Sequence, residues 1–251
     1  MSETSSFSYA DSPYPIRDDL VAVNRRAWAR LAAAGAWFDG PERTAIARET
    51  RAARDCGLCR ERKAALSPNS VSGQHDRASE LDETVVDVVH RVATDASRLS
   101  RDYFKRVTGA GLAEGAYVEI VGTVVTVLSI DWFHRALGLP LEELPTPIPG
   151  EPSRRLPDGV VRGEAWVPML AGKSKSGPEA DLFAGLPMAP NVLRALSAVP
   201  DEVRTLKDLS GAYYLHGLEV ADPSFDGGRA IDRAQMELVA ARVSALNECF
   251  Y

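Results

Sequence analysis

Apolar residues recur at three- and four-residue intervals along most of this 251-residue chain, which is the pattern of helices that bury one face. Helix-forming Ala, Arg and Glu fill the intervals, and Gly or Pro stands at most of the breaks. The predicted helices cover residues 18–34, 41–54, 82–93, 94–109, 112–137, 191–198, 201–216 and 231–246. Thr94-Asp95 is the expected N-terminal cap of the fourth helix, which carries Leu99, Tyr103 and Val107 and ends at Gly109.

Strand and helix preferences conflict between residues 112 and 137, where Val, Thr and Ile favour a strand. Periodicity favours a helix, because one face is apolar and consists of Val118, Val121, Val125, Leu128 and Trp132. A second face is made of small residues, Gly122, Thr123, Thr126 and Ser129, so it could pack closely on another helix. We therefore predict a long buried helix that ends at Gly138 and Pro140. Since no β-hairpin signal appears, we predict an all-α fold.

The chain divides into two helical regions joined by a segment without a regular pattern. Of the 16 prolines, ten lie between Pro140 and Pro190, so residues 141–189 are predicted to be a linker or an irregular wrap. The first helical unit is expected at residues 18–140 and the second at residues 190–251. Residues 1–17 are polar and Ser-rich, and they lack the basic and apolar regions of a secretory signal. We expect them to be a disordered segment.

The composition of the chain argues against two classes of binding partner, nucleic acids and membranes. The net charge is −6 and no run of Lys or Arg forms a basic stripe, which argues against nucleic acid. The most apolar stretch, residues 116–130, is too short for a bilayer and contains Glu119, so no membrane partner is expected. We expect a cytoplasmic protein. Its three cysteines would then be free thiols, and the close spacing of two of them favours catalysis or metal binding over a structural disulfide.

The strongest chemical signal is the motif Cys56-Gly57-Leu58-Cys59. Two thiols in the first turn of a helix can form a disulfide, and the free amide groups of that turn stabilise a thiolate. Asp55 is the expected N-cap, and Lys63, four residues after Cys59, would place a positive charge on the same face. Glu49 precedes Cys56 by seven residues, but the expected break between the two helices leaves its position open.

Two other interpretations of the motif stay open. The thiols could be half of a zinc site, although the remaining candidate ligands are scattered along the sequence: His75, His90, His134, His216 and Cys249. They could also be small buried residues with a purely structural role. Thiol reactivity would discriminate among these interpretations, because an inert buried pair argues against catalysis.

Two parts of the chain resemble one known family. Residues 40–49 lead into the Cys56–Cys59 motif, and residues 117–122 and 136–140 follow a Gly-rich turn. Residues 233–237 and 243–251 show a similar approach to Cys249. These stretches resemble the alkylhydroperoxidase D and carboxymuconolactone decarboxylase-like family. The resemblance implies an alkylhydroperoxidase D-like helical bundle arranged as a tandem pseudo-repeat, in which the second unit is incomplete.

The departures from the family pattern affect both units. The family glutamate stands twelve residues before the first cysteine, where this chain has Thr44 in the first unit and Glu237, before Cys249, in the second. Lys63 occupies the position of the family's motif histidine. The glutamate–histidine proton relay therefore cannot be assigned to the first unit from the sequence, and Cys249 lacks a second thiol.

The resemblance implies a thiol-dependent peroxidase, or a related thiol–disulfide oxidoreductase, in which Cys59 attacks the peroxide and Cys56 resolves the product. The expected partners are a small hydroperoxide and an external thiol reductant, with no cofactor and no bound metal. The resemblance also implies a homo-oligomer, a trimer or hexamer. Two alternatives are a non-catalytic helical scaffold for oligomerisation and a lactone decarboxylase-like enzyme, although a decarboxylase would not need the thiol pair.

His134 lies on the long helix and could face the thiols, but a packed or capped histidine is the simpler expectation. Glu119 is expected to pair with an arginine in the same packing layer or, less simply, to act in catalysis. The chain ends where the family's second cysteine is due, so a UGA codon for selenocysteine, a designed boundary and an early stop are the three alternatives. The codon after Tyr251 would distinguish them.

Overall fold

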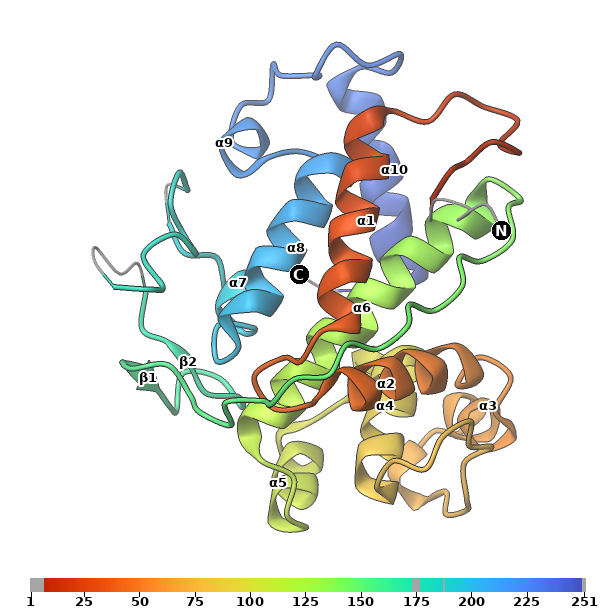
Figure 1. Cartoon of the computed structure of the whole chain (residues 1–251), viewed down its shortest axis with the longest axis vertical. Coiled ribbons are helices and arrows are strands. Elements are labelled where there is room, and N and C mark those ends of the chain that lie inside the picture. The colour runs from red at the N-terminus through yellow and green to blue at the C-terminus, as the bar shows by residue number, and fades with distance from the viewer. Residues whose placement is uncertain (1–6, 173–176, 187, 250–251) are drawn as a thin grey trace.

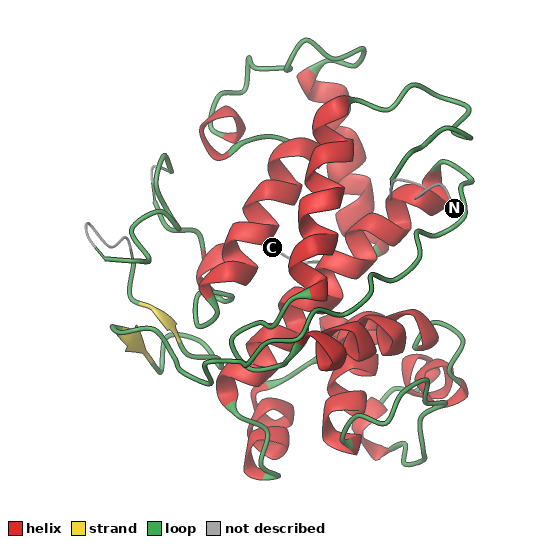
Figure 2. Cartoon of the chain, in the orientation of Figure 1, coloured by secondary structure: helices red, strands yellow, loops and turns green. Residues whose placement is uncertain are grey.

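A computed structural model describes residues 7–172, 177–186 and 188–249, and these residues form a mostly helical protein with long loops (Figures 1 and 2). The α-helices are α1 Asp18–Ala32, α2 Gly40–Ala52, α3 Gly57–Ala64, α4 Glu83–Asp95, α5 Arg101–Gly109, α6 Glu114–Ala136, α7 Asn191–Arg194, α8 Pro200–Tyr213, α9 Gly217–Val220 and α10 Arg233–Leu246. Two 3₁₀ turns, Pro68–Ser70 and Ala96–Arg98, flank α4. The strands β1 Val160–Val161 and β2 Met169–Leu170 pair antiparallel. The predicted all-α class is confirmed.

Side-chain caps set several helix starts. Asp39 and Glu42 form a reciprocal capping box at the start of α2, and Asp232 and Gln235 form another at α10. The predicted cap at Thr94-Asp95 is wrong, since α4 continues through Asp95 and the Thr94 hydroxyl donates to the His90 carbonyl within the helix. The cap of α5 is Ser100, whose hydroxyl accepts a hydrogen bond from the Tyr103 amide at 3.2 Å.

The predicted long helix, α6, runs diagonally through the molecule and packs against α1, α2, α4 and α8 (Figure 1). Its small-residue face packs closely on α8, because a Cβ atom at Gly122 would lie 2.6 Å from the Glu202 Cβ. The predicted apolar face is not buried at its C-terminal residue, Trp132. Trp132 is 56% exposed, and the guanidinium groups of Arg54 and Arg135 lie over its ring.

Length and composition alone would allow α6 to span a membrane, since it has 23 residues and high hydropathy. However, 67% of its most apolar window is buried by the rest of the protein. Buried carboxylates such as Glu119 also lie on it. We describe α6 as a core helix.

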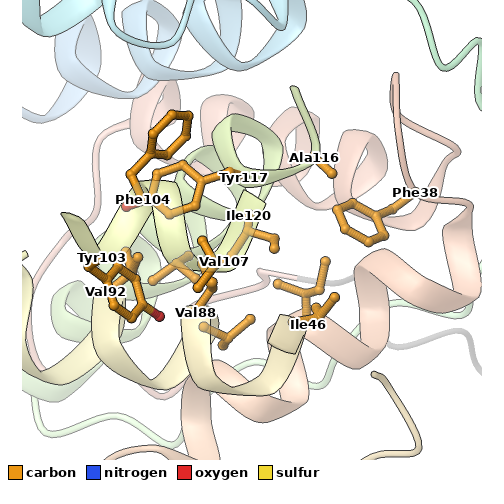
Figure 3. Close-up of a cluster of buried hydrophobic side chains, with 13 residues drawn as sticks. Phe38, Ile46, Val88, Val92, Tyr103, Phe104, Val107, Ala116, Tyr117 and Ile120 are labelled. Carbon is orange, nitrogen blue, oxygen red and sulfur yellow. The ribbon is translucent and has the colours of Figure 1, made fainter. Parts of the chain in front are cut away.

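The core lies on both sides of α6. One cluster joins α2, α4, α5 and α6 (Figure 3) and contains the edge-to-face pair Phe104 and Tyr117, whose centroids are 5.0 Å apart. A second cluster joins α1, α6 and α8 and includes Phe7, which is 1% exposed and lies edge-on to Trp28. The expectation of disorder through residue 17 is therefore wrong at Phe7. Residues 1–6 lie outside the described residues.

The segment that follows α6 forms a wrap across the first helices. The Ile148 amide donates to the Ala32 carbonyl at 2.8 Å, and the Arg154 amide donates to the Ala36 carbonyl at 2.7 Å. The Trp28 indole donates to the Glu143 carbonyl at 2.8 Å. Of the two sequence alternatives for this segment, these contacts fit a wrap, and the chain beyond it returns to place α8 against α1 and α6.

Helix α10 is the most exposed of the long helices. Among its described residues Met236 alone is buried, while a stripe of apolar side chains faces outward: Leu238, Val239, Val243 and Leu246. These positions fall within one side of the helix by the 3.6-residue repeat.

Candidate functional site

Both thiols of the predicted motif lie at the start of α3, which packs against α4 in the lower part of Figure 1. Cys56 is the N-cap residue and Gly57 is the first helical residue, so the expectation of Asp55 as the cap is wrong. Cys59 follows in the first turn. The chain turns sharply after α2, with the Cys56 amide 3.4 Å from the Ala53 carbonyl, and this turn directs both side chains inward. Cys56 is 0% and Cys59 is 3% exposed, and both are free thiols.

Two histidines from different segments meet these thiols. His75 comes from the irregular segment between α3 and α4, and its Nδ1 atom lies 3.5 Å from Cys56 Sγ and 3.6 Å from Cys59 Sγ. His90 is a buried residue of α4, and its Nδ1 atom lies 3.3 Å from Cys59 Sγ. The imidazole rings are 4.3 Å apart. The four side chains form one compact cluster.

The Glu49 carboxylate orients the His90 ring from the side opposite the thiols. Glu49 of α2 is 0% exposed, and its Oε2 atom lies 3.0 Å from His90 Nε2. The Ser79 hydroxyl and the Ala78 amide donate to the other carboxylate oxygen at 2.6 and 2.9 Å. Burial raises the pKa of Glu49, but these hydrogen bonds outweigh it and leave the pKa below its usual value. Glu49 is therefore an anion that accepts the Nε2 proton of His90.

A second carboxylate orients His75. The Asp87 Oδ1 atom lies 3.0 Å from His75 Nε2 and 2.6 Å from the Arg62 guanidinium, while the Tyr103 hydroxyl donates to Oδ2 at 2.9 Å. Burial raises the pKa of Asp87, yet hydrogen bonds from His75 and Arg62 reverse the effect and lower it strongly. Both rings thus present Nδ1 to the thiols and Nε2 to a carboxylate.

The four groups differ in how tightly they hold a proton. Burial lowers the pKa of His90 below the usual value, whereas the hydrogen bonds of His75 to Asp87 and Cys56 outweigh burial and raise its pKa. Burial also raises the pKa of Cys56, but the Asp76 amide and neighbouring donors bring it below the usual value. Burial, with a smaller contribution from the charge of Cys56, raises the pKa of Cys59 to about 12. Of the two thiols, Cys56 therefore loses its proton more readily, and Cys59 holds its proton more tightly.

Two sequence conclusions change in consequence. The histidines were expected to be too scattered to complete a metal site, but ligand atoms of Cys56, Cys59, His75 and His90 all lie within 4.8 Å of one another. The first unit was expected to lack a glutamate–histidine relay, yet Glu49 and His90 form one next to Cys59. These residues occupy different sequence positions from the family's relay.

A cavity of about 310 Å³ reaches Cys59 from outside. Several of its lining residues are basic, including Arg54, Arg60, Lys63 and Arg135. The Lys63 ammonium, expected to face the thiols, donates to the Thr94 carbonyl at 3.2 Å and lines this cavity. A larger apolar cavity of about 1000 Å³, bordered by α4 and α6, shares Lys63, Thr94 and Leu128 with it. A small solute can therefore approach Cys59 through a positively charged opening.

The two secondary candidates on α6 lie in structural networks. Glu119 is 0% exposed, pairs with Arg43 at 2.5 Å and accepts from the Trp37 amide at 2.6 Å, which agrees with the expected arginine pair. His134 is buried, with Nδ1 2.7 Å from the Pro140 carbonyl and Nε2 3.1 Å from the Tyr9 hydroxyl. His134 is thus a packed histidine.

The candidate pair of the second unit lies outside the cluster. Glu237 is exposed on α10 and hydrogen-bonds to the Tyr214 hydroxyl and to Arg233. Cys249 is exposed beyond the end of the same helix. A helix rises about 1.5 Å per residue, so Glu237 and the helix end at Leu246 are about 13 Å apart. The structure does not bring Glu237 and Cys249 together.

Sequence reasoning named His75 and His90 only among scattered candidate ligands for zinc, and it did not select Asp87. His90 carried a usable signal, because it interrupts the apolar face of α4 between Val86, Val89 and Val92, where a polar side chain needs a partner. His75 lies in a segment without periodicity and carried no comparable signal.

Comparisons with known proteins add no identification: no family model matches the chain, and no curated protein or solved structure matches it.

Proposed function

We propose that the protein is a thiol-dependent peroxidase, or a closely related thiol–disulfide oxidoreductase, in which Cys59 attacks a hydroperoxide and Cys56 resolves the product. The observation that carries this proposal is the buried chain of contacts from Glu49 through His90 to Cys59. It supplies a base beside the thiol and an anion that fixes the base, which is the arrangement of an activated nucleophile. Cys59 is also the thiol that borders the cavity.

The first step follows from the hydrogen-bond directions. Neutral His90 donates its Nε2 proton to Glu49, so its Nδ1 atom can take the proton of the Cys59 thiol. Because burial raises the pKa of Cys59 to about 12, the proton leaves the thiol as the sulfur attacks and not in a separate earlier step. The sulfur attacks the peroxide oxygen that carries hydrogen, the O–O bond breaks, and His90 returns the proton to the leaving alkoxide. The products are an alcohol and the sulfenic acid of Cys59. This relay supplies the protonation that Lys63 could not.

The second step uses the other sulfur. Cys56 attacks the Cys59 sulfur, the S–O bond breaks, and the oxygen leaves as water after protonation. Both sulfurs belong to the cluster whose ligand atoms lie within 4.8 Å of one another, so a small side-chain movement could form the disulfide. An external dithiol must then reduce it. A reducing cytoplasm would supply such a thiol, which fits the expected compartment.

The basic lining of the cavity favours small hydroperoxides that carry an acidic group over neutral ones of the same size. We also propose that residues 18–140 adopt an alkylhydroperoxidase D-like arrangement. Support comes from the Cys-x-x-Cys motif at the start of a helix and from a glutamate–histidine relay at the second thiol. Both features match the chemistry that the sequence resemblance implies.

Peroxide consumption by the reduced, chelator-treated protein tests the proposal. We expect catalytic turnover with a dithiol reductant in the wild type and no turnover in Cys59→Ser. The matched control is Cys249→Ser, which removes the exposed thiol and should keep the wild-type rate. Equal rates for the wild type and Cys59→Ser would contradict the proposal.

A further inference from the structure

The relay from Glu49 to Cys59 accounts for one of the two histidines and leaves the other without a role. His75 Nδ1 lies at nearly equal distances, 3.5 and 3.6 Å, from Cys56 and Cys59. The Asp87 carboxylate, which Arg62 and Tyr103 hold in place, accepts a hydrogen bond from His75 Nε2 and fixes the ring there. A peroxidase step through His90 needs none of these contacts. We infer that Cys56, Cys59, His75 and His90 bind one zinc ion when the thiols are reduced.

The distances between ligand atoms fit this ion. Zinc binds thiolates at about 2.3 Å and imidazoles at about 2.0–2.1 Å in tetrahedral sites, which places sulfur and nitrogen ligands about 3.5 Å apart. Three of the four sulfur–nitrogen separations in the cluster are 3.3, 3.5 and 3.6 Å, and the fourth, between Cys56 and His90, is within 4.8 Å. The fourth position is filled by protein, so the site has the closed Cys₂His₂ form of a structural zinc centre.

Ligand chemistry narrows the choice of metal. Two sulfurs and two imidazole nitrogens disfavour calcium and magnesium, which prefer oxygen ligands. Tetrahedral S₂N₂ geometry is typical of zinc. Four protein side chains fill the four tetrahedral positions, so no position stays open for the water of a catalytic zinc site.

The carboxylates behind the rings supply the independent observation. Metal-binding histidines usually donate their second ring N–H to a carboxylate, which fixes the tautomer that presents the free nitrogen to the metal. Both histidines here show that arrangement, since Nε2 of His90 meets Glu49 and Nε2 of His75 meets Asp87, each at 3.0 Å. One histidine–carboxylate pair is enough for a proton relay. Two histidine–carboxylate pairs that both point at Cys56 and Cys59 indicate a metal centre.

The ion would also order the chain around the site. His75 belongs to the irregular segment between α3 and α4, where the local hydrophobic cluster is small and consists of Cys56, Leu58 and Cys59 with Val71 against it. A zinc ion would join that segment to the start of α3 and to α4. Such a crosslink compensates for the small local core, because metal binding contributes directly to folding.

Zinc and peroxide would compete for the same atoms. The ion occupies the Nδ1 lone pair of His90 and both sulfurs, so the zinc-bound form is the resting state and the metal-free dithiol is the reactive one. Reaction of the metal-free dithiol with one hydroperoxide gives a disulfide, an alcohol and water. The two electrons pass from sulfur to the peroxide oxygens, and the disulfide cannot bind the ion again until it is reduced. Zinc binding itself does not depend on this reaction.

Cobalt(II) titration of the reduced, full-length protein tests the site. We expect one equivalent to bind, with the visible bands of tetrahedral cobalt and near-ultraviolet thiolate charge-transfer bands, and we expect one equivalent of zinc to displace it. His75→Asn should lower zinc affinity at least about 100-fold, and Asp87→Asn, a positioning change, about 10- to 100-fold. Cys249→Ser is the matched control and should bind as the wild type does. Circular dichroism checks that each variant is folded.

Several results would overturn the inference: less than one equivalent bound at micromolar cobalt, an octahedral spectrum without thiolate bands, or unchanged affinity in folded His75→Asn. If Cys59→Ser or His75→Asn does not fold, wild-type stoichiometry and spectrum decide the question. The two proposals remain separable. If the protein binds zinc but consumes no peroxide after chelation, the metal site is supported and the peroxidase proposal is wrong. If it consumes peroxide but binds no zinc, the peroxidase proposal is supported and the metal site is wrong.

Discussion

The Nδ1 atom of His90 lies 3.3 Å from the Sγ atom of Cys59, and this contact joins the middle of α4 to the first turn of α3. The histidine also meets Glu49 of α2 at 3.0 Å, so three helices converge on one thiol. Since all three side chains are almost fully buried, their relative positions are set by core packing.

Replacing Glu49 with Gln should slow peroxide consumption about 100-fold with little change in KM. The amide cannot act as an anion toward His90, so the ring loses both its fixed tautomer and the charge that stabilises it when protonated. Glu49 acts through His90 and is a positioning residue. Stopped-flow kinetics on the chelated, reduced protein measures the effect, with the exposed Glu61→Gln of α3 as the control. A loss confined to KM would contradict the relay.

Cys56→Ser should react once with peroxide and then stop. Cys59 can still form a sulfenic acid, but the resolving sulfur is missing. Mass spectrometry after addition of a cyclic 1,3-diketone, which captures sulfenic acids, should find one adduct on Cys59 per chain. The wild type should show a disulfide between Cys56 and Cys59 instead. An adduct on Cys249, with Cys59 unmodified, would reverse the assignment of the attacking thiol.

Local sequence signals predicted the scaffold better than the site. The long helix α6 followed from the three- and four-residue steps of its apolar face, and the small face at Gly122 packs on α8 as expected. Caps were less predictable, since Thr94 and Ser100 are both good capping residues and tertiary packing decides how far α4 continues.

The cluster could be predicted only in part. Cys56 and Cys59 were evident because both lie within one helical turn, where spacing fixes proximity. His75 reaches them through an irregular segment whose path depends on Asp87, Arg62 and Tyr103, and sequence periodicity carries no information about such a path. Comparison with the family's spacing pointed to Lys63 as the substitute for the histidine, whereas the structure supplies His90 from the next helix.

The exposed stripe on α10 predicts association between copies of the chain. Leu238, Val239, Val243 and Leu246 are each at least half exposed, and a contiguous apolar surface of this kind favours burial against a partner. We propose a homo-oligomer, as the sequence resemblance implies. Light scattering should show that Val239→Glu with Val243→Glu lowers the oligomer mass while the circular dichroism stays unchanged. Ala241→Glu, which lies outside the stripe, is the control. A wild-type monomer would contradict the prediction.

Arg43 lies between two buried carboxylates, with Nη1 2.5 Å from Glu119 and 2.9 Å from Glu202. Removing the cation should cost more than removing one anion, because Arg43→Met leaves two buried negative charges without a partner. We expect a loss of about 3–5 kcal/mol in the free energy of unfolding for Arg43→Met. Glu119→Gln leaves one carboxylate for one guanidinium and should be milder. Urea denaturation of each variant measures the difference.

The same network sets a pH dependence with a definite sign. Burial raises the pKa of Glu119; Arg43 opposes this and the charge of Glu202 adds to it, leaving the folded-state pKa above the usual value. The folded chain therefore binds the Glu119 proton more tightly than the unfolded chain does. The contribution of Glu119 to stability is present at low pH and declines as the pH rises from the usual glutamate pKa through the raised one.

Glu119→Gln cannot lose that proton, so its stability relative to the wild type should increase over the same pH window. Paired urea denaturations at several pH values between about 4 and 8 would measure the trend, since exposed glutamates titrate near the lower limit. Glu114→Gln is the matched control on α6, because Glu114 forms a solvent-accessible pair with Arg162 and such pairs contribute little to stability. A difference between wild type and Glu119→Gln that stays constant with pH would show that Glu119 titrates alike in the folded and unfolded chains. The buried network would then not perturb its proton affinity.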